Sequence, residues 1–175
     1  SPKFKKIFVL TMGYKGYRKG PIIVNKNYDF HEVGDESIIH SLRGPTCMSK
    51  NRKNGAFFCK KEKSDLILMD DGLQSKNIRK DITILVIDSE YCFGNEMIFP
   101  SGPLRQKINS ALEISDIILI IGNNKKIYSY TNILSKKIFF AEKKISFKNL
   151  KKPNIFAFSG LGNNKNFFDL LKKNK

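Results

Sequence analysis

Two adjacent carboxylates, Asp70 and Asp71, follow directly on the apolar run Leu66–Met69 and precede Gly72. Two like charges about 4 Å apart repel by about 4 kcal/mol at an effective dielectric near 20, so a cation or open water must lie beside them. An aspartate at the end of a buried strand is where many nucleotide-binding enzymes hold Mg²⁺ beside phosphates. The pair is therefore a candidate metal site, and the alternative is an Asp-Gly turn with two solvated carboxylates.

A third carboxylate, Asp35, lies in the stretch EVGDES near the expected start of a helix. A carboxylate in that position could take the proton from an attacking hydroxyl group, which is general-base catalysis. It could equally cap the helix by accepting hydrogen bonds from the first backbone N–H groups. The sequence leaves both interpretations of Asp35 open.

Glycines and cations are interleaved in TMGYKGYRKG, residues 11–20, directly after an apolar run. Backbone N–H groups in such loops form concave sites for anions, which makes Gly13, Tyr14 and Lys15 candidate contacts for a phosphate or an anionic substrate. The loop matches neither the GxxxxGK[ST] pattern nor GxGxxG, so its local signal is weak.

Arg105 comes early in the helix expected after the Pro/Gly turn of FPSGPLRQ. A guanidinium group there offers the fork geometry that suits phosphate oxygens, although a solvated surface arginine is the default interpretation. The two histidines, His31 and His40, are expected to satisfy local hydrogen bonds rather than to bind a metal. Three cysteines without a CxxC pair indicate reduced, mostly buried thiols and a cytoplasmic setting.

Short apolar runs, separated by polar and turn-rich stretches, must position these residues. Several runs are apolar without alternation, as in parallel strands covered on both faces, so we predict an α/β fold with a mainly parallel sheet flanked by helices. The expected strands are Ile7–Met12, Ile22–Val24, Thr46–Met48, Leu66–Met69, Ile82–Ile87, Ile117–Ile121 and Ile155–Phe158, with a weaker one at Ile138–Ile145. The expected helices are Asp35–Leu42, Asn51–Lys63, Leu104–Ser115 and Lys165–Lys173. Ligands collect at the carboxyl ends of such strands, so we expect Asp35, the Gly13 loop and the Asp70–Asp71 pair on one edge.

The composition indicates a globular protein, because 41% of the 175 residues are hydrophobic. The net charge of +16 first suggests a polyanion partner. However, 27 of the 32 cationic residues are lysine, and Lys, Asn, Ile and Phe are abundant together, which indicates A/T-rich coding bias. Specific nucleic-acid readers rely on arginine, so no nucleic acid is expected, and a basic nucleic-acid-binding module is kept as an alternative. No apolar run approaches the about 20 residues that span a bilayer.

Seven stretches, taken together and in order, resemble the tetraacyldisaccharide 4'-kinase family of lipid A biosynthesis. They are VLTMGYKG, EVGDES, SKNRKNGA, LILMDDGLQ, KDITILVID, GNEMIFPSGPLR and AFSGLGNNKNFFDLL. The resemblance runs from about Ile7 to Leu171 and is weakest over Lys125–Lys152.

The resemblance implies a transferase with a P-loop NTPase fold, which moves the γ-phosphate of ATP to the 4'-hydroxyl of a lipid A disaccharide precursor with the help of Mg²⁺. It implies a peripheral enzyme at the cytoplasmic face of the bacterial inner membrane, with the anionic membrane surface as a partner. The family's GDE matches Asp35, as the base toward the sugar hydroxyl. Its DDG matches Asp70 and Asp71, near metal and phosphates, and its GPLR matches Arg105, as an anion contact.

The resemblance also implies a P-loop upstream of residue 1 and a C-terminal domain beyond the first predicted helix. We therefore expect a fragment without its initiating Met, with residues 1–137 as a kinase core, 138–153 as an extended linker and 154–175 as the beginning of a C-terminal domain. Such a chain is expected to be inactive alone, and a separately encoded N-terminal segment is one candidate partner. Met12, Ser75 and Gln106 stand where the family usually has Arg, His and Glu, so a degenerate, non-catalytic remnant is a further alternative.

Overall fold

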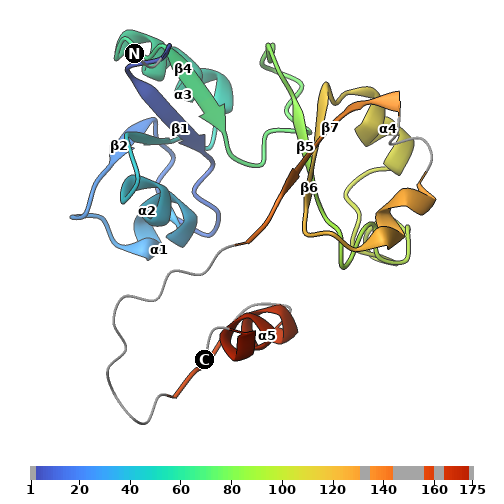
Figure 1. The fold of residues 1–175 in the computed structure, drawn as a ribbon. Coiled ribbons are helices and arrows are strands. Elements are labelled where there is room, and N and C mark those ends of the chain that lie inside the picture. Colours follow the sequence, from blue (N-terminus) through green and yellow to red (C-terminus); the bar gives the residue numbers. More distant parts are fainter. Residues whose placement is uncertain (1–2, 131–134, 144–155, 160–163, 174–175) are drawn as a thin grey trace.

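The strands of the chain form two separate sheets in a computed structural model that describes residues 3–130, 135–143, 156–159 and 164–173. Figure 1 shows two lobes, one built on each sheet. We call them the first lobe and the second lobe. The α/β prediction with mainly parallel strands is confirmed.

The first lobe holds a four-stranded sheet in the order β2-β3-β1-β4. Its strands are β1 (Ile7–Thr11), β2 (Ile22–Val24), β3 (Thr46–Met48) and β4 (Leu66–Met69), as the apolar runs predict. Strand β1 pairs in parallel with β3 and with β4, whereas β2 pairs antiparallel with β3. Three strands therefore end at the same edge of the sheet.

Three helices cover this sheet: α1 (Phe30–Val33), α2 (Asp35–Ser41) and α3 (Arg52–Lys61). The short α1, which the sequence patterns miss, starts in a capping box between Asp29 and Glu32. The side chain of Asn51 caps α3 by accepting a hydrogen bond from the Asn54 N–H.

The core of the first lobe lies on both faces of the sheet. Helix α3 encloses one apolar cluster, which contains Phe8, Leu10, Cys47 and Cys59. A second cluster of Val24, Val33 and Met48 packs under α1 and α2. Cys47 and Cys59 are buried and free and Cys92 is half-buried and free, as predicted from the cysteine spacing.

The second lobe holds three parallel strands in the order β5-β6-β7. They are β5 (Ile84–Asp88), β6 (Ile117–Ile121) and β7 (Lys137–Ala141). The helix α4 (Ile108–Glu113) and the 3₁₀-helix η1 (Lys125–Ser129) accompany them. One core joins these elements, with the buried residues Ile87, Phe93, Leu112, Ile118, Ile120 and Ile127.

Two predicted elements start at least two residues later than the sequence suggests. Helix α4 starts at Ile108 rather than at Leu104, because the Leu104 carbonyl accepts the N–H of Phe99 (2.8 Å) within a loop and does not accept a helical hydrogen bond. Strand β5 starts at Ile84, where its pairing with Ile117 begins, so Ile82 is left 63% exposed.

The predicted strand Ile155–Phe158 is wrong for the residues that are described. Residues 156–159 form no strand, and Phe156 and Phe158 are 96% and 91% exposed. An extended segment without a paired neighbour has no ladder to hold it. The helix α5 (Asn164–Lys173) is present almost as predicted.

The proposed division at residue 137 passes through β7. Strand β7 pairs with β6 over its whole length, so residues 138–141 belong to the second sheet. The rest of the expected linker, from residue 144 to residue 153, lies outside the described residues, as does the end of the strand predicted at Ile138–Ile145. The division into core, linker and C-terminal domain otherwise stays a prediction.

Candidate active site

Parallel pairing brings three loops to one edge of the first sheet. They follow β1 at Met12, β3 at Ser49 and β4 at Asp70. The Ser49 N–H donates to the carbonyl of Thr11 (2.9 Å), and the Asp70 N–H donates to the carbonyl of Leu10 (3.0 Å). We call this edge the catalytic edge. It carries both Asp70 and the Gly13 loop, as predicted from their positions directly after parallel strands.

The glycine loop folds tightly against the start of α2. Gly13 has a φ of +61°, and a Cβ there would overlap the carbonyl oxygen of Val33. A Cβ on Gly34 would come 2.5 Å from the carbonyl oxygen of Tyr14. Only glycines permit this approach, and it places the loop beside the first residue of α2. Lys50 Nζ donates to the carbonyl oxygen of Gly13 (2.6 Å) and fixes the loop from the other side.

Asp35 is the first residue of α2, and its side chain is exposed. The capping interpretation is wrong, because the N-cap is Gly34 and no side chain caps this helix. Among the described residues, no hydrogen bond or ion pair of the Asp35 carboxylate is found. The carboxylate therefore lies at the catalytic edge, next to the glycine loop, and is able to accept a proton.

Asp70 has a partner on the same helix as Asp35. His40 Nε2 lies 3.1 Å from Asp70 Oδ2, and each side chain is about one third exposed (33%). The contact of His40 is thus not the local hydrogen bond that was predicted, because its partner lies 30 residues further along the chain and is a candidate metal ligand.

Asp71 is paired with Arg105, which comes from the second lobe. The hydrogen bond to the Asp71 carboxylate and its charge raise the pKa of the Arg105 guanidinium; burial lowers this pKa, and the charges of Glu36 and of the Tyr14 phenol group raise it further. The DDG turn and the GPLR loop therefore meet at the pair of Asp71 and Arg105. Both members of the pair are largely exposed, at 66% and 54%, so the pair contributes little to stability.

Asp70 and Asp71 thus each have a partner within the protein, His40 for Asp70 and Arg105 for Asp71. No group of three or more His, Cys, Asp or Glu side chains that could hold a metal occurs among the described residues. Mg²⁺ is usually held by one or two carboxylates together with substrate phosphates. Asp70 and Asp71 fit the ion in that shared arrangement, with phosphate oxygens as the remaining ligands.

Arg52, the first residue of α3, holds the DDG turn and was not singled out from the sequence. Its guanidinium donates to the Ser75 hydroxyl (2.6 Å) and to the carbonyl oxygens of Asp70 (2.9 Å) and Asp71 (2.8 Å). A signal was available, because a cation in the first turn of a helix is unfavourable toward the helix dipole and needs another partner. Its Nε is buried without a hydrogen bond in the described structure.

Lys80 supports the same turn from its far end. Its ammonium group donates to the carbonyl oxygens of Leu73 (2.9 Å), Ser75 (2.9 Å) and Gly72 (3.3 Å). Asp71 itself has a φ of +51°, which is uncommon for a residue other than glycine. Two cations therefore hold the backbone of this turn in a strained conformation.

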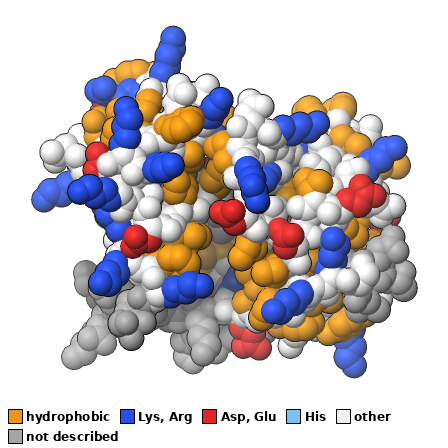
Figure 2. All heavy atoms as spheres, turned by 90° about the horizontal axis from the view of Figure 1, so that it is seen from above, with side chains coloured by type: hydrophobic (Ala, Val, Ile, Leu, Met, Phe, Trp, Pro, Cys, Tyr) orange, Lys and Arg blue, Asp and Glu red, His pale blue; other side chains and the backbone are white. Residues whose placement is uncertain are grey.

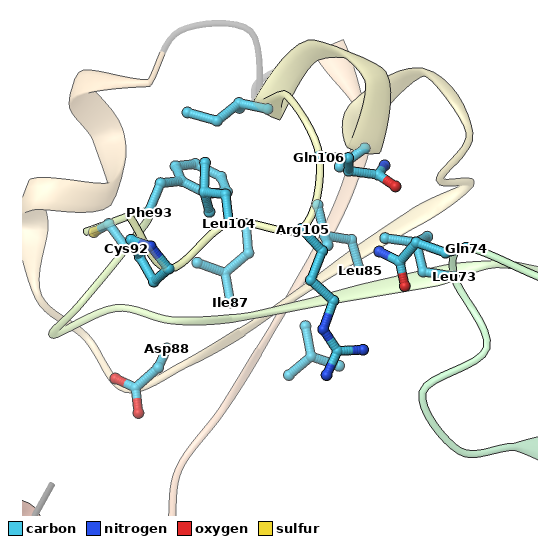
Figure 3. A pocket seen from close by; sticks show the side chains of 14 residues that line it. Leu73, Gln74, Leu85, Ile87, Asp88, Cys92, Phe93, Leu104, Arg105 and Gln106 are labelled. Carbon is cyan, nitrogen blue, oxygen red and sulfur yellow. The ribbon is translucent and has the colours of Figure 1, made fainter. Parts of the chain in front are cut away.

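A pocket of about 200 Å³ opens beside the turn, between Gln74, strand β5 and the GPLR loop. Figure 3 shows Leu85, Ile87, Phe93 and Leu104 along its apolar wall, with the polar side chains of Gln74, Arg105 and Gln106 around it. Gln106, which stands where a carboxylate is usual in the resembled family, is thus beside the site but brings no charge to it.

A family comparison decides the relationship. The family model described as tetraacyldisaccharide-1-P 4'-kinase matches residues 3–175. The chain belongs to the tetraacyldisaccharide 4'-kinase family. The resemblance inferred from the seven stretches is confirmed.

Curated relatives in this kinase family agree. The tetraacyldisaccharide 4'-kinases of Rickettsia canadensis and Rickettsia bellii are each 37% identical to the chain, over 166 and 169 residues. Each match covers 94% of this chain and 51% of the relative, so the chain spans about half the length of the curated relatives it matches.

A solved member of the family has the same fold. The Aquifex aeolicus LpxK structure, determined in complex with ATP, matches 96% of this chain and 58% of its own chain with a TM-score of 0.74 and 22% identity. The chain therefore shares the fold of this kinase. In the described part of the chain, no helix is long and apolar enough to span a membrane.

Proposed function

We propose that this chain supplies the acceptor-side half of the active site of a tetraacyldisaccharide 4'-kinase. The reaction transfers the γ-phosphate of ATP to the 4'-hydroxyl of a lipid A disaccharide precursor. Family membership supports the chemistry. The observation that carries the assignment is the Asp35 carboxylate, which has no partner among the described residues and lies beside the glycine loop, on the edge that also holds Asp70.

Asp35 acts as the general base. Its carboxylate accepts the proton of the sugar 4'-hydroxyl, and the hydroxyl oxygen forms a bond to the γ-phosphorus. The bond from this phosphorus to the bridging oxygen breaks, and ADP leaves with that electron pair. Such a transfer depends mainly on positioning and charge neutralisation, so holding Asp35 rigidly at the start of α2 is a large part of its contribution.

The groups around Asp35 bind negative charge. Tyr14 and Lys15 sit exposed on the glycine loop, and Arg105 reaches the same edge, so these three are candidate contacts for substrate and phosphate oxygens. Asp70 and Asp71 would hold Mg²⁺, whose chemistry is to neutralise charge on the β- and γ-phosphates. His40 and Arg52 keep these two aspartates in place.

The phosphate cradle for ATP is proposed to come from a segment outside these 175 residues, which contain no GxxxxGK[ST] motif. A separately encoded N-terminal segment that carries this motif is the proposed partner. The site of action is the cytoplasmic face of the inner membrane, with peripheral attachment through the lysine-rich surface and the anionic lipid headgroups.

A fusion tests the function. The segment of the Rickettsia canadensis relative that carries its P-loop is joined to this chain, and transfer of labelled phosphate from ATP to a tetraacyldisaccharide 1-phosphate is measured. Transfer that depends on both the lipid and Mg²⁺ is expected. A folded fusion that binds ATP but transfers no phosphate would support a non-catalytic remnant instead.

A further inference from the structure

Helix α2 carries two polar side chains that leave it in different directions. Asp35 is its first residue, and His40 follows five positions later. Positions five apart in an α-helix are separated by about 140° around the axis and by about 7 Å along it. The Asp35 side chain is exposed, whereas His40 reaches the end of β4. A contact made by His40 therefore also fixes the direction in which α2 presents Asp35.

One hydrogen bond joins His40 on α2 to the DDG turn after β4. His40 Nε2 lies 3.1 Å from Asp70 Oδ2, and both side chains are partly buried. An ionised carboxylate has only acceptor oxygens, so the hydrogen atom is on Nε2 and the imidazole is the donor. A hydrogen bond to a charged group is stronger than one between neutral groups, and partial burial strengthens it further. The bond is therefore able to hold the two elements together.

The other contacts of α2 give it little directional support. The helix packs on β1, β2 and β3, where Ile38 contacts the apolar cluster under α1 and α2. The hydroxyl groups of Ser37 and Ser41 donate to the nearby carbonyl oxygens of Val33 (2.6 Å) and Ile38 (2.7 Å). No side chain caps the first turn. Apolar packing has no preferred direction, so the bond of His40 to the end of β4 fixes the rotation of α2.

The group that His40 contacts is itself firmly held. The Asp70 N–H donates to the carbonyl oxygen of Leu10 (3.0 Å), and the Asp70 carbonyl oxygen accepts a hydrogen bond from Arg52 (2.9 Å). His40 holds one oxygen of the carboxylate, Oδ2. No partner of the other oxygen, Oδ1, is found in the part of the chain that the structure describes. The bond to His40 thus orients the carboxylate and leaves one oxygen able to bind a metal ion.

From these contacts we infer that His40 is a positioning residue for the phosphate transfer. Its hydrogen bond ties the helix of the proposed base, Asp35, to the carboxylate that would hold Mg²⁺, Asp70. The bond thereby sets the distance between the proton acceptor and the metal. His40 acts through these two side chains and takes no proton from the substrate. The inference rests on the proposed function for the roles of the two aspartates, whereas the tie between α2 and β4 exists without it.

Loss of this tie should affect the chemical step more than the binding of the lipid. Without it, α2 is free to rotate about its axis, and Asp35 moves relative to Asp70. Phosphate transfer depends mainly on the mutual position of the base, the metal and the phosphate, and a misplacement of about 1 Å costs up to about 10²-fold in rate. The lipid contacts a wider surface, so its KM should change little.

Nuclear magnetic resonance of the histidine rings tests the tie in the 175-residue chain itself. The chain has two histidines, so the ring spectrum is simple. We expect His40 to carry its hydrogen on Nε2, and Asp70→Asn should shift the ring signals of His40 and leave those of His31 in place. Asp81→Asn, at an exposed aspartate before β5, is the control and should shift neither ring. Ring signals of His40 that do not respond to Asp70→Asn would overturn the inference.

A matched pair of variants at position 40 tests the effect on the reaction, in the fusion described above. The side-chain nitrogen of glutamine is as many bonds from the backbone as Nε2 of histidine, whereas that of asparagine is one bond closer. His40→Gln should therefore keep the hydrogen bond, and His40→Asn should lose it. We expect kcat to fall at least about tenfold for His40→Asn and less than about threefold for His40→Gln, with the KM for the lipid within about twofold in both.

Mn²⁺, used as a probe of the Mg²⁺ site, gives a readout that does not depend on turnover. Groups that orient metal-binding side chains typically account for about 10–100-fold in metal affinity. The affinity of the fusion for Mn²⁺ is measured by electron paramagnetic resonance with a non-hydrolysable ATP analogue. It should fall at least about tenfold for His40→Asn and stay within about twofold for His40→Gln. A merely structural role would lower the stability of His40→Asn and leave its metal affinity unchanged.

Equal kcat and equal Mn²⁺ affinity of the two variants would overturn the inference. If His40→Asn does not fold, the ring signals of the Asp70→Asn chain decide, because that comparison keeps His40. A fusion without phosphate transfer, in which the ring signals and the Mn²⁺ affinity respond as expected, would reject the proposed function and leave the tie between His40 and Asp70 standing. Phosphate transfer at the same rate in both variants would do the reverse.

Discussion

At the scale of single residues, Asp35 is the proposed general base. Its neighbours Asp70 and Asp71 both have cationic or hydrogen-bonding partners, whereas no partner of the Asp35 side chain is found among the described residues. A base that must receive a proton from a substrate has to be free in this way.

Asp35→Asn in the fused enzyme should therefore lower kcat by about 10²–10⁴-fold, with little change in the KM for ATP, because general-base catalysis contributes that much and the base does not hold the nucleotide. Asp81→Asn, the same change at an exposed aspartate before β5, is the control and should stay within twofold. Steady-state kinetics with both substrates varied measures the two effects. An equal decrease of kcat in both variants, or an effect of Asp35→Asn on the KM for ATP alone, would show that Asp35 is not the general base.

Arg105 makes an exposed ion pair, and we propose that it binds an anion of the substrates. Arg105→Ala should change the free energy of unfolding by less than about 1 kcal/mol, because exposed pairs contribute little. The same variant in the fused enzyme should lose at least about tenfold in kcat/KM, and Arg105→Lys should restore little, because a lysine lacks the guanidinium fork. Urea unfolding and kinetics separate the two effects, and a large loss of stability with unchanged kinetics would contradict the assignment.

At the scale of elements, the DDG turn depends on cations from other elements. Arg52→Ala removes three hydrogen bonds and leaves the carbonyl oxygens of Asp70 and Asp71 with fewer partners, so we expect a loss of about 1–3 kcal/mol in the free energy of unfolding. Lys53→Ala, the next residue on α3, is the control and should cost under about 0.5 kcal/mol. Urea denaturation of the two variants measures the difference, and similar losses would show that the turn does not need Arg52.

The ends of β5 and β7 are joined by an ion pair between Asp88 and Lys143 (2.7 Å). Burial would raise the pKa of the Asp88 carboxyl, but Lys143 and the N–H of Glu90 outweigh burial and hold the pKa below its ordinary value. The pair therefore adds stability above the ordinary aspartate range, near pH 4, and this stability is lost as the pH falls below it.

Lys143→Met should lower the free energy of unfolding by up to about 1 kcal/mol at pH 7 and by less at pH 3. Lys60→Met, at an exposed position on α3, is the control and should lower the free energy of unfolding by the same small amount at both pH values. Urea titrations at the two pH values measure this, and a loss for Lys143→Met that is independent of pH would contradict the linkage.

The sequence predicts most elements because their apolar runs are fully apolar and end at turn residues. Strands such as Thr46–Met48 and Leu66–Met69 have the predicted bounds, since no tertiary contact competes with the local pattern. The start of α4 could not be predicted, because it depends on the loop hydrogen bond from Phe99 to Leu104. The lack of a strand at residues 156–158 could not be predicted either, because it depends on the absence of a paired strand in the described structure. At the site, Asp35 could be found from its motif, whereas the role of Arg52 depends on a backbone 18 residues away in the chain.

At the scale of the whole molecule, Lys and Arg side chains are spread over the face drawn in Figure 2. Lysines near an anionic membrane contribute about 1 kcal/mol each, and salt screens them. Co-sedimentation with liposomes should therefore rise with the fraction of anionic lipid and fall between 50 mM and 500 mM salt. Sedimentation that is indifferent to both would contradict membrane attachment. Stronger retention on duplex DNA than on such liposomes, at moderate salt, would favour the nucleic-acid alternative.

The central claim is that this chain supplies the acceptor-side catalytic edge and that a P-loop segment supplies the phosphate cradle. The most direct measurement is the position-specific phosphorylation of a tetraacyldisaccharide 1-phosphate, followed by ³¹P spectroscopy and mass spectrometry. Three samples are compared: the 175-residue chain, the P-loop segment, and the two mixed. The account predicts a 4'-phosphate only in the mixture, with Mg²⁺ and ATP present. Clear 4'-phosphorylation by the 175-residue chain alone, or by the P-loop segment alone, would contradict it.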